Sequence, residues 1–190
     1  MTYPQIRLEE YCTIIPDYHI PVNPGDDEQG MYKVIPGSIK YSDIDFSVCR
    51  RVSTMMIPHI ERYMPQYGDV LIARMGPLTA KVVYFVKDEE PSYLISGFIR
   101  LRCSSILQAK WIYHYLRTEN AQKDIESLLG DGVMPHLSHR DLGNLMIPIP
   151  DEKTMQELVD SLDAILTEQS ECIKRVGELE TIYRTKLSEI

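Results

Sequence analysis

Features that would place the chain in a membrane, on an export route or among redox proteins are missing from the sequence. No apolar run approaches the roughly 18–20 residues of a membrane span. The first residues lack the basic start and apolar stretch of a signal peptide, so we expect a cytoplasmic protein. The four cysteines lack the C-x-x-C spacing of a zinc or redox site. We expect reduced, mostly buried thiols at Cys12, Cys49, Cys103 and Cys172.

Motifs that carry catalysis are missing as well. The sequence has no Gly-x-Gly-x-x-Gly, no P-loop and no His-Glu-x-x-His zinc motif. It also lacks the Asn/Asp-Pro-Pro-aromatic motif with which adenine methyltransferases grip a flipped base. The nearest pair of its five histidines is His136 and His139, and Ser138 between them suits a helix cap better than a metal site. We therefore predict no catalytic residue, no metal ligand and no cofactor.

Positive charge is scarce, and its distribution limits where a polyanion could bind. The net charge is −8, which argues against a general polyanion binder. Met1–Val48 has eight acidic and three basic residues, and Asp151–Ile190 has ten acidic and five basic residues. Cys49–Pro150 has ten acidic and twelve basic residues, so only this middle part is not repelled by phosphate. Any surface for DNA should lie there.

Apolar runs predict strands within residues 1–150. Hydrophobic residues make up 44% of the chain, which is typical of a folded protein. Frequent prolines up to about residue 65 indicate short strands and long loops. Residues 69–74 and 80–86 are typical of two strands joined by a turn, and residues 93–102 predict a third. In the third strand, Arg100 and Arg102 share one face of the sheet because side chains alternate along a strand.

Helical spacing begins after the third predicted strand. The Ser105-x-x-Gln108 pattern is a capping box and predicts a helix after it. A second short helix is predicted over residues 119–129, with Gly130 as its C-cap. Ser138 has the position of an N-cap for another short helical turn. With the predicted strands, these helices indicate an α/β (α+β) domain over residues 1–150.

Residues 151–190 have the pattern of one long helix. Thr154-x-x-Glu157 is a second capping box, and no proline follows it. Apolar residues then recur at alternating spacings of three and four, as in a coiled coil. A helix of about 37 residues would be about 55 Å long, too long for its own small domain to cover. We expect a partner helix along a seam that includes Leu158, Leu162, Ile165, Cys172, Val176, Leu179 and Tyr183.

Four stretches of the sequence resemble type I restriction-modification specificity subunits. Residues 67–76 are similar to the family's strand and glycine turn, and residues 81–84 to the strand that follows. The family often has a glycine where this chain has Ala80. Residues 132–142 resemble the loop before the family's last short helix, and residues 147–150 resemble the entry to its long helix. The resemblance rests on the order and spacing of these stretches and covers roughly residues 33 to 190.

The resemblance implies a fold and a role. It implies a recognition domain with a curved, mixed β-sheet and short flanking helices, followed by a long coiled-coil helix. Members of the family usually carry two such domains, separated by two long antiparallel helices, and read a split DNA target. This chain resembles half of such a subunit: a DNA target-recognition domain over residues 1–150 and a spacer or dimerisation helix over residues 151–190. The expected partners are double-stranded DNA, a separate N6-adenine methyltransferase, a restriction subunit and a second copy of this chain.

Under this interpretation, eight polar residues are candidates for contact with DNA. An arginine can donate two hydrogen bonds to guanine, whereas lysine and loop donors suit phosphate. Arg74 lies at a strand end beside a glycine turn, and Lys81 opens the return strand. The candidates are Arg74, Lys81, Arg100, Arg102, His136, Ser138, His139 and Arg140.

Each candidate also has a purely structural explanation. Arg74 and Lys81 fit equally well as solvated charges. The two arginines of residues 93–102 can instead pair with nearby acids such as Asp88 and Glu89. The loop at residues 136–140 can simply cap a helix and pack on the sheet.

A second function, from another class, stays open at this point. The chain could be a protein-interaction adaptor that works through its coiled coil, with an α/β domain that binds protein or a small ligand. The acidic ends of the chain favour this alternative.

Overall fold

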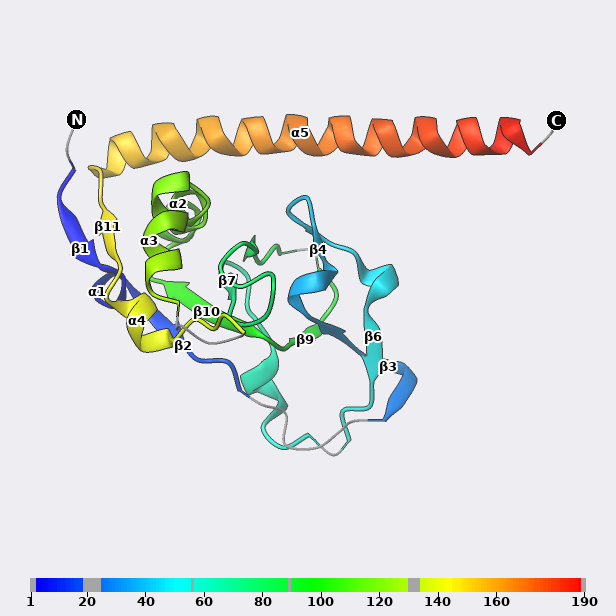
Figure 1. The fold of residues 1–190 in the computed structure, drawn as a ribbon, viewed down its shortest axis with the longest axis horizontal. Helices are drawn as coiled ribbons and strands as arrows, with labels where there is room; N and C mark the ends of the chain where they lie inside the picture. Colours follow the sequence, from blue (N-terminus) through cyan, green and yellow to red (C-terminus); the bar gives the residue numbers. More distant parts are fainter. Residues whose placement is uncertain (1–2, 19–24, 56, 89, 130–133, 189–190) are drawn as a thin grey trace. The chain divides into compact units, whose positions relative to one another are not determined.

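The computed structural model describes residues 3–18, 25–55, 57–88, 90–129 and 134–188. The chain divides into two compact units, Met1–Pro150 and Asp151–Ile190, and each is described by itself (Figure 1). Among the described residues, no helix is long and apolar enough to cross a membrane.

A four-stranded antiparallel sheet forms the centre of the first unit. Its order is β2 (Cys12–Ile15), β10 (Phe98–Cys103), β7 (Val70–Ala73) and β8 (Val83–Phe85). Every residue of β7 is buried, which explains its unbroken apolar sequence, because a strand covered on both faces needs no polar alternation. The helix α2 (Ile106–Leu116) packs against β7, β8 and β10.

A second, mixed sheet of three strands lies beside the first. Its order is β6 (Arg50–Val52), β3 (Asp26–Val34) and β9 (Tyr93–Ile95), with β3 antiparallel to β6 and parallel to β9. The single strand predicted over residues 93–102 is therefore wrong, since β9 and β10 belong to different sheets. Gly97, at a φ of +84°, separates the two strands with a backbone turn that other residues rarely adopt.

A half-buried carboxyl group, that of Glu90, contacts two tyrosines of the core. Glu90 accepts hydrogen bonds from the hydroxyl groups of Tyr84 and Tyr93, and the Tyr93 bond is 3.0 Å long. Burial raises the pKa of Glu90 to about 7, although the hydrogen bond from Tyr93 acts in the opposite direction. The group therefore titrates close to neutral pH.

Short elements complete the first unit. β1 (Gln5–Arg7) pairs with β11 (Met146–Pro148), and β4 (Ile39–Lys40) pairs with β5 (Asp43–Ile44). Together with the two larger sheets and the helices, these pairs give the α/β class that the sequence predicted. The remaining short helical elements are α1 (Leu8–Tyr11), η1 (Pro36–Ser38), η2 (Phe46–Val48) and η3 (Ile60–Tyr63).

The first helices begin where the sequence predicted. The Ser105 hydroxyl accepts a hydrogen bond from the Gln108 backbone N–H, as in a capping box, while the Gln108 side chain bonds to Ser104. α3 spans Glu119–Ser127, and its C-cap is Leu128, so the predicted C-cap at Gly130, a residue outside the described ones, is wrong.

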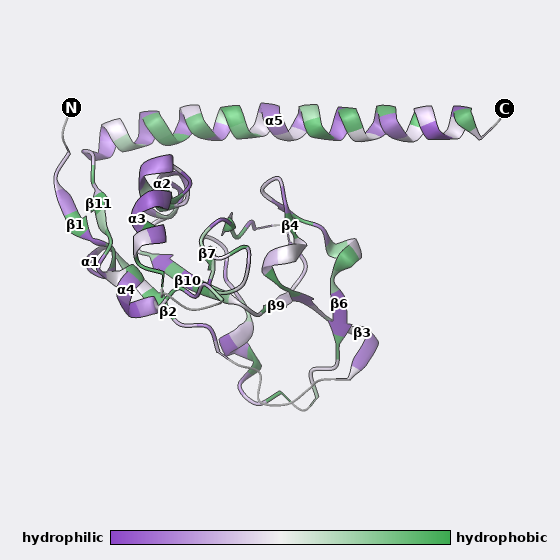
Figure 2. Cartoon of the chain, viewed as in Figure 1, coloured by the Kyte–Doolittle hydropathy of each residue, from purple (hydrophilic) through white to green (hydrophobic). Residues whose placement is uncertain are grey.

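The second unit is one helix, α5 (Glu152–Leu187), of 36 residues and about 54 Å. Its N-cap is Asp151, so the predicted capping box at Thr154 is wrong. The Asp151 carboxylate accepts hydrogen bonds from the Thr154 backbone N–H at 3.0 Å and from its hydroxyl at 2.6 Å. Hydrophobic and hydrophilic bands alternate along α5 (Figure 2). Its exposed large apolar side chains are Leu158, Leu162, Ile165, Val176, Leu179, Ile182, Tyr183 and Leu187.

Candidate nucleic-acid interface

Arg74 lies directly after β7, where the strand meets the glycine turn. Its backbone N–H donates to the Gly97 carbonyl at 2.9 Å, which fixes the residue at the end of the sheet. Its guanidinium lies 3.6 Å from the Asp17 carboxylate, and its side chain is 34% exposed. Arg74 thus has an oriented side chain that still reaches solvent.

The turn after Arg74 is joined to the loop that contains His136. The Leu137 backbone N–H donates to the Arg74 carbonyl at 2.7 Å, and Met75 forms a β-bridge with His136. The Thr79 hydroxyl bonds to the carbonyls of Gly76 and Pro135. Two segments far apart in the sequence therefore form one surface, which we call the tip: residues 74–81 and 134–138.

Lys81 belongs to the tip and is exposed. The residue before it, Ala80, has a φ of +61°, the left-handed conformation that favours glycine. This explains why the resembled family often has a glycine there. Alanine holds the same turn at a cost of about 1–2 kcal/mol.

The tip also carries apolar side chains that the sequence analysis did not identify. Met75, Leu78 and Met134 are exposed, Met134 at 72%. Apolar side chains at a DNA interface can contact thymine methyl groups or base steps. Their signal in the sequence is weak, because isolated methionines in loops are common.

A second group of predicted residues surrounds a cavity of about 740 Å³. Arg102, His139 and Arg140 line it together with Glu9 and Glu10. The two glutamates add negative charge, so the cavity itself is poorly suited to phosphate. Exposed His139 and Arg140 are nonetheless available at the surface.

Ser138 caps α4 (His139–Gly143), as predicted. Its hydroxyl accepts a hydrogen bond from the Arg140 backbone N–H at 3.2 Å. Leu137, just before it, is fully buried. The loop at residues 136–140 therefore caps a helix and packs on the domain, which agrees with the structural explanation given for it in the sequence analysis. Gly132 and Val133, the first residues of the resembled loop, lie outside the described residues.

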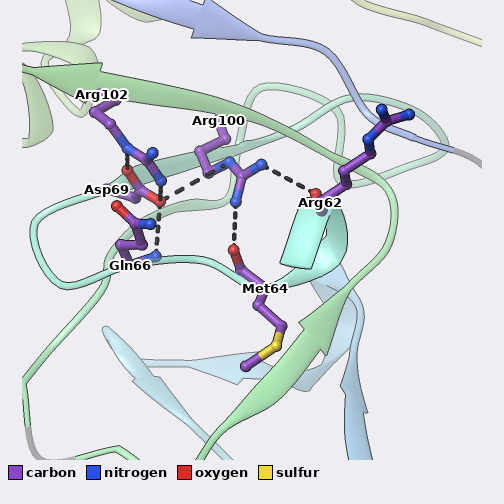
Figure 3. A network of polar contacts seen from close by, with 6 residues as sticks. All are labelled: Arg62, Met64, Gln66, Asp69, Arg100 and Arg102. Atoms are coloured by element: carbon purple, nitrogen blue, oxygen red, sulfur yellow. Dashed lines mark hydrogen bonds and ion pairs between the residues drawn. The ribbon is translucent and has the colours of Figure 1, made fainter. Parts of the chain in front are cut away.

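Arg100 and Arg102 point toward Asp69 (Figure 3). The Asp69 carboxylate accepts two hydrogen bonds from Arg102, at 2.7 and 2.8 Å, and one from the Gln66 backbone N–H. Both arginines pair with an acid, as the structural explanation predicted, but the acid is Asp69 and not Asp88. Glu89 lies outside the described residues.

Arg100 is almost fully enclosed, with a side chain only 6% exposed. Its guanidinium donates to the Met64 carbonyl at 2.5 Å and to the Arg62 carbonyl at 3.1 Å, and it lies 3.8 Å from Asp69. Burial lowers the pKa of Arg100, partly offset by the Asp69 charge. A guanidinium held in this way cannot reach a base edge, so its geometry suits a structural role.

The cysteines differ from expectation in one respect. Only Cys12 is buried, Cys49 and Cys103 are half-buried and Cys172 is exposed. The expectation of mostly buried thiols is therefore wrong, and Cys172 lies on the apolar seam of α5.

Comparisons with known proteins agree with this geometry. Residues 4–181 match the family described as Type I restriction modification DNA specificity domain. The comparison with curated proteins gave no match.

Three solved structures share the fold of this chain. A chain from a structure of the type I R-M system has a TM-score of 0.63 and 19% identity, and the match covers 92% of this chain and 40% of that one. The HsdS subunit from Thermoanaerobacter tengcongensis has a TM-score of 0.64 and 20% identity, covering 92% and 44%. The S subunit from M. genitalium has a TM-score of 0.59 and 12% identity, covering 86% and 39%.

This chain thus spans about two fifths of the length of the three chains that it matches. The predicted family, fold class and role in DNA specificity are confirmed, and the role is one of recognition rather than catalysis. The chain belongs to the type I restriction-modification DNA specificity family, as a target-recognition domain.

Proposed function

We propose that the chain is the DNA-reading half of a type I specificity subunit, with residues 1–150 as the recognition domain and residues 151–190 as the spacer helix. The family match over residues 4–181, in a chain that spans only 40–44% of two matched structures, carries this proposal. In the resembled family, two recognition domains and two spacer helices make a whole subunit. One domain and one helix correspond to half of that arrangement.

The tip is the part of the domain that we assign to DNA. Arg74 provides a guanidinium for a guanine edge, and Lys81 provides a charge for phosphate. His136 lies beside Arg74 through the β-bridge with Met75, and Arg140 follows in the same loop and helix. We do not assign Arg100 to DNA, because its guanidinium donates hydrogen bonds to two backbone carbonyls of the domain.

Arg102, Ser138 and His139 play supporting parts in this proposal. Arg102 is neutralised by Asp69, and the Ser138 hydroxyl is used in the helix cap. His139 is exposed and lines the cavity, and we assign it to phosphate.

The partners follow from the family. The chain would position a separate N6-adenine methyltransferase, and with it a restriction subunit, on the DNA target. It would need neither a cofactor nor a metal of its own. The protein-interaction adaptor gains no support beyond the acidic ends of the chain.

A mobility-shift experiment tests this proposal. The chain alone should bind DNA weakly, because few excess basic residues release few counterions. Addition of the methyltransferase subunit should tighten binding and make it depend on sequence. Tight, salt-resistant binding of any sequence by the chain alone would contradict the proposal.

The second copy is proposed to bind along α5. Eight large apolar side chains are exposed on this helix, more than a soluble monomer usually leaves in one stripe. Two copies related by a two-fold axis would place their helices antiparallel, as in the resembled family, and would read a split palindrome.

Light scattering tests the dimer. Val176→Asp with Leu179→Asp should yield monomers, whereas Lys174→Asp on the same helix should leave the dimer intact. A monomer of the unaltered chain at tens of micromolar, with its helix formed, would show that the partner helix belongs to another chain.

A further inference from the structure

Two of the four cysteines face each other across adjacent strands. Cys12 of β2 is the direct antiparallel partner of Cys103 in β10. Opposed residues in an antiparallel pair have Cα atoms about 4.5–5.5 Å apart. A disulfide requires about 4.4–6.8 Å between Cα atoms, so the strand pairing already provides a suitable separation.

The two thiols also contact each other. A side-chain hydrogen bond with Cys103 is the largest cause of a raised pKa at Cys12, and burial is the next. The Cys12 thiol also lies 3.5 Å from the Leu8 carbonyl.

Both cysteines border a cavity that is open to solvent. It is the cavity of about 740 Å³ that His139 and Arg140 also line. Cys103 is half-buried, whereas Cys12 is only 6% exposed. A small oxidant in the cavity therefore reaches Cys103 more readily than Cys12.

We propose that Cys12 and Cys103 form a reversible dithiol–disulfide site in the recognition domain, oxidised by a hydroperoxide. This proposal does not rest on the proposed function in DNA recognition. The Cys103 sulfur gives up its proton and attacks one oxygen of hydrogen peroxide. The O–O bond breaks, the departing hydroxide takes up that proton and leaves as water, and Cys103 becomes a sulfenic acid. The Cys12 sulfur then attacks the Cys103 sulfur, an S–S bond forms and a second water leaves. Two thiols lose two electrons in total, and the peroxide gains them. A dithiol reductant reverses the change by exchange.

The bond would tie the first strand of the central sheet to β10. Because positions 12 and 103 are far apart in the sequence, it would close a long loop and restrict the unfolded chain. We expect the melting temperature to rise by roughly 5–15 °C on oxidation.

The test uses the full chain with Cys49→Ser and Cys172→Ser, which retains only the proposed pair. Hydrogen peroxide should remove both free thiols, as counted by alkylation after denaturation. Peptide mapping should find the Cys12–Cys103 linkage, and dithiothreitol should restore both thiols and the lower melting temperature.

Controls separate the pair from general thiol oxidation. Adding Cys103→Ser to this variant should leave one thiol, no intramolecular linkage and no rise in melting temperature. The unaltered chain should give the same Cys12–Cys103 peptide, which covers the case in which the serine variant folds poorly. Irreversible sulfinic or sulfonic acids in place of the linkage, or the linkage only after denaturation, would overturn the proposal.

Discussion

Replacement of Asp69 by asparagine should destabilise the first unit more than loss of an exposed acid does. The Asp69 side chain is 1% exposed, accepts two hydrogen bonds from Arg102 and lies 3.8 Å from Arg100. Asparagine keeps the shape but removes the charge that compensates two guanidinium groups. Breaking a buried ion pair in this way costs about 3–5 kcal/mol, because the other charge stays buried.

For Asp69→Asn, we expect a cost at the lower end of the range of about 3–5 kcal/mol. The Arg102 side chain is 37% exposed, so water can compensate part of its charge. We expect a loss of about 3 kcal/mol in the free energy of unfolding, which corresponds to about 6–12 °C in melting temperature.

Urea denaturation followed by circular dichroism measures this loss. Asp88→Asn is the matched control, because Asp88 is exposed and should change the free energy of unfolding by less than about 0.5 kcal/mol. In a double-mutant cycle, Asp69→Asn combined with Arg102→Met should cost less than the sum of the two single changes. An Asp69→Asn loss equal to that of Asp88→Asn would refute the reasoning.

Three further predictions concern the tip, the Glu90 carboxyl group and the long helix. With the methyltransferase present, mobility shifts should show that Arg74→Ala lowers the discrimination between DNA sequences by about 1–3 kcal/mol. Arg140→Ala should lower the slope of log affinity against log salt concentration by about one. Lys174→Ala, the control, should change neither quantity. The folded-state pKa of Glu90 is raised to about 7, so stability should fall as pH rises from about 4.5 to 7 in urea titrations, and Glu90→Gln should remove this dependence. Four residues inserted after Gln169 should lengthen α5 by about 6 Å and widen the gap between methylated half-sites by one or two base pairs, at about 3.4 Å each.

Local patterns predicted the elements that local physics determines. β7 was predicted from its apolar run, and α5 from apolar spacings of three and four over ten turns. Both signals depend on neighbouring residues alone. The pairing of β3 with β6 and β9, by contrast, joins segments that no short-range pattern connects.

The errors have physical reasons of the same kind. Strand-forming residues on both sides of Gly97 led to one predicted strand over residues 93–102, but Gly97 turns the chain from one sheet to the other. At the start of α5, Asp151 and Thr154 are both good caps, and the earlier residue is the one whose carboxylate reaches two donors. Sequence spacing could not choose between them.

Arg74 and Arg100 show why the site was harder to predict than the fold. Arg74 follows an apolar strand and Arg100 lies within one, and for both residues the sequence left a DNA contact and a structural role open. Arg100 gives two donors to backbone carbonyls, which hold it whether or not DNA is present. Within the described residues, the Arg74 guanidinium has one ion pair, at 3.6 Å to Asp17, a contact that DNA can replace at little cost. An arginine can read a base only when its N–H donors are not already hydrogen-bonded within the protein. Whether they are depends on which carbonyl groups the fold brings close to the guanidinium, and sequence patterns do not give this.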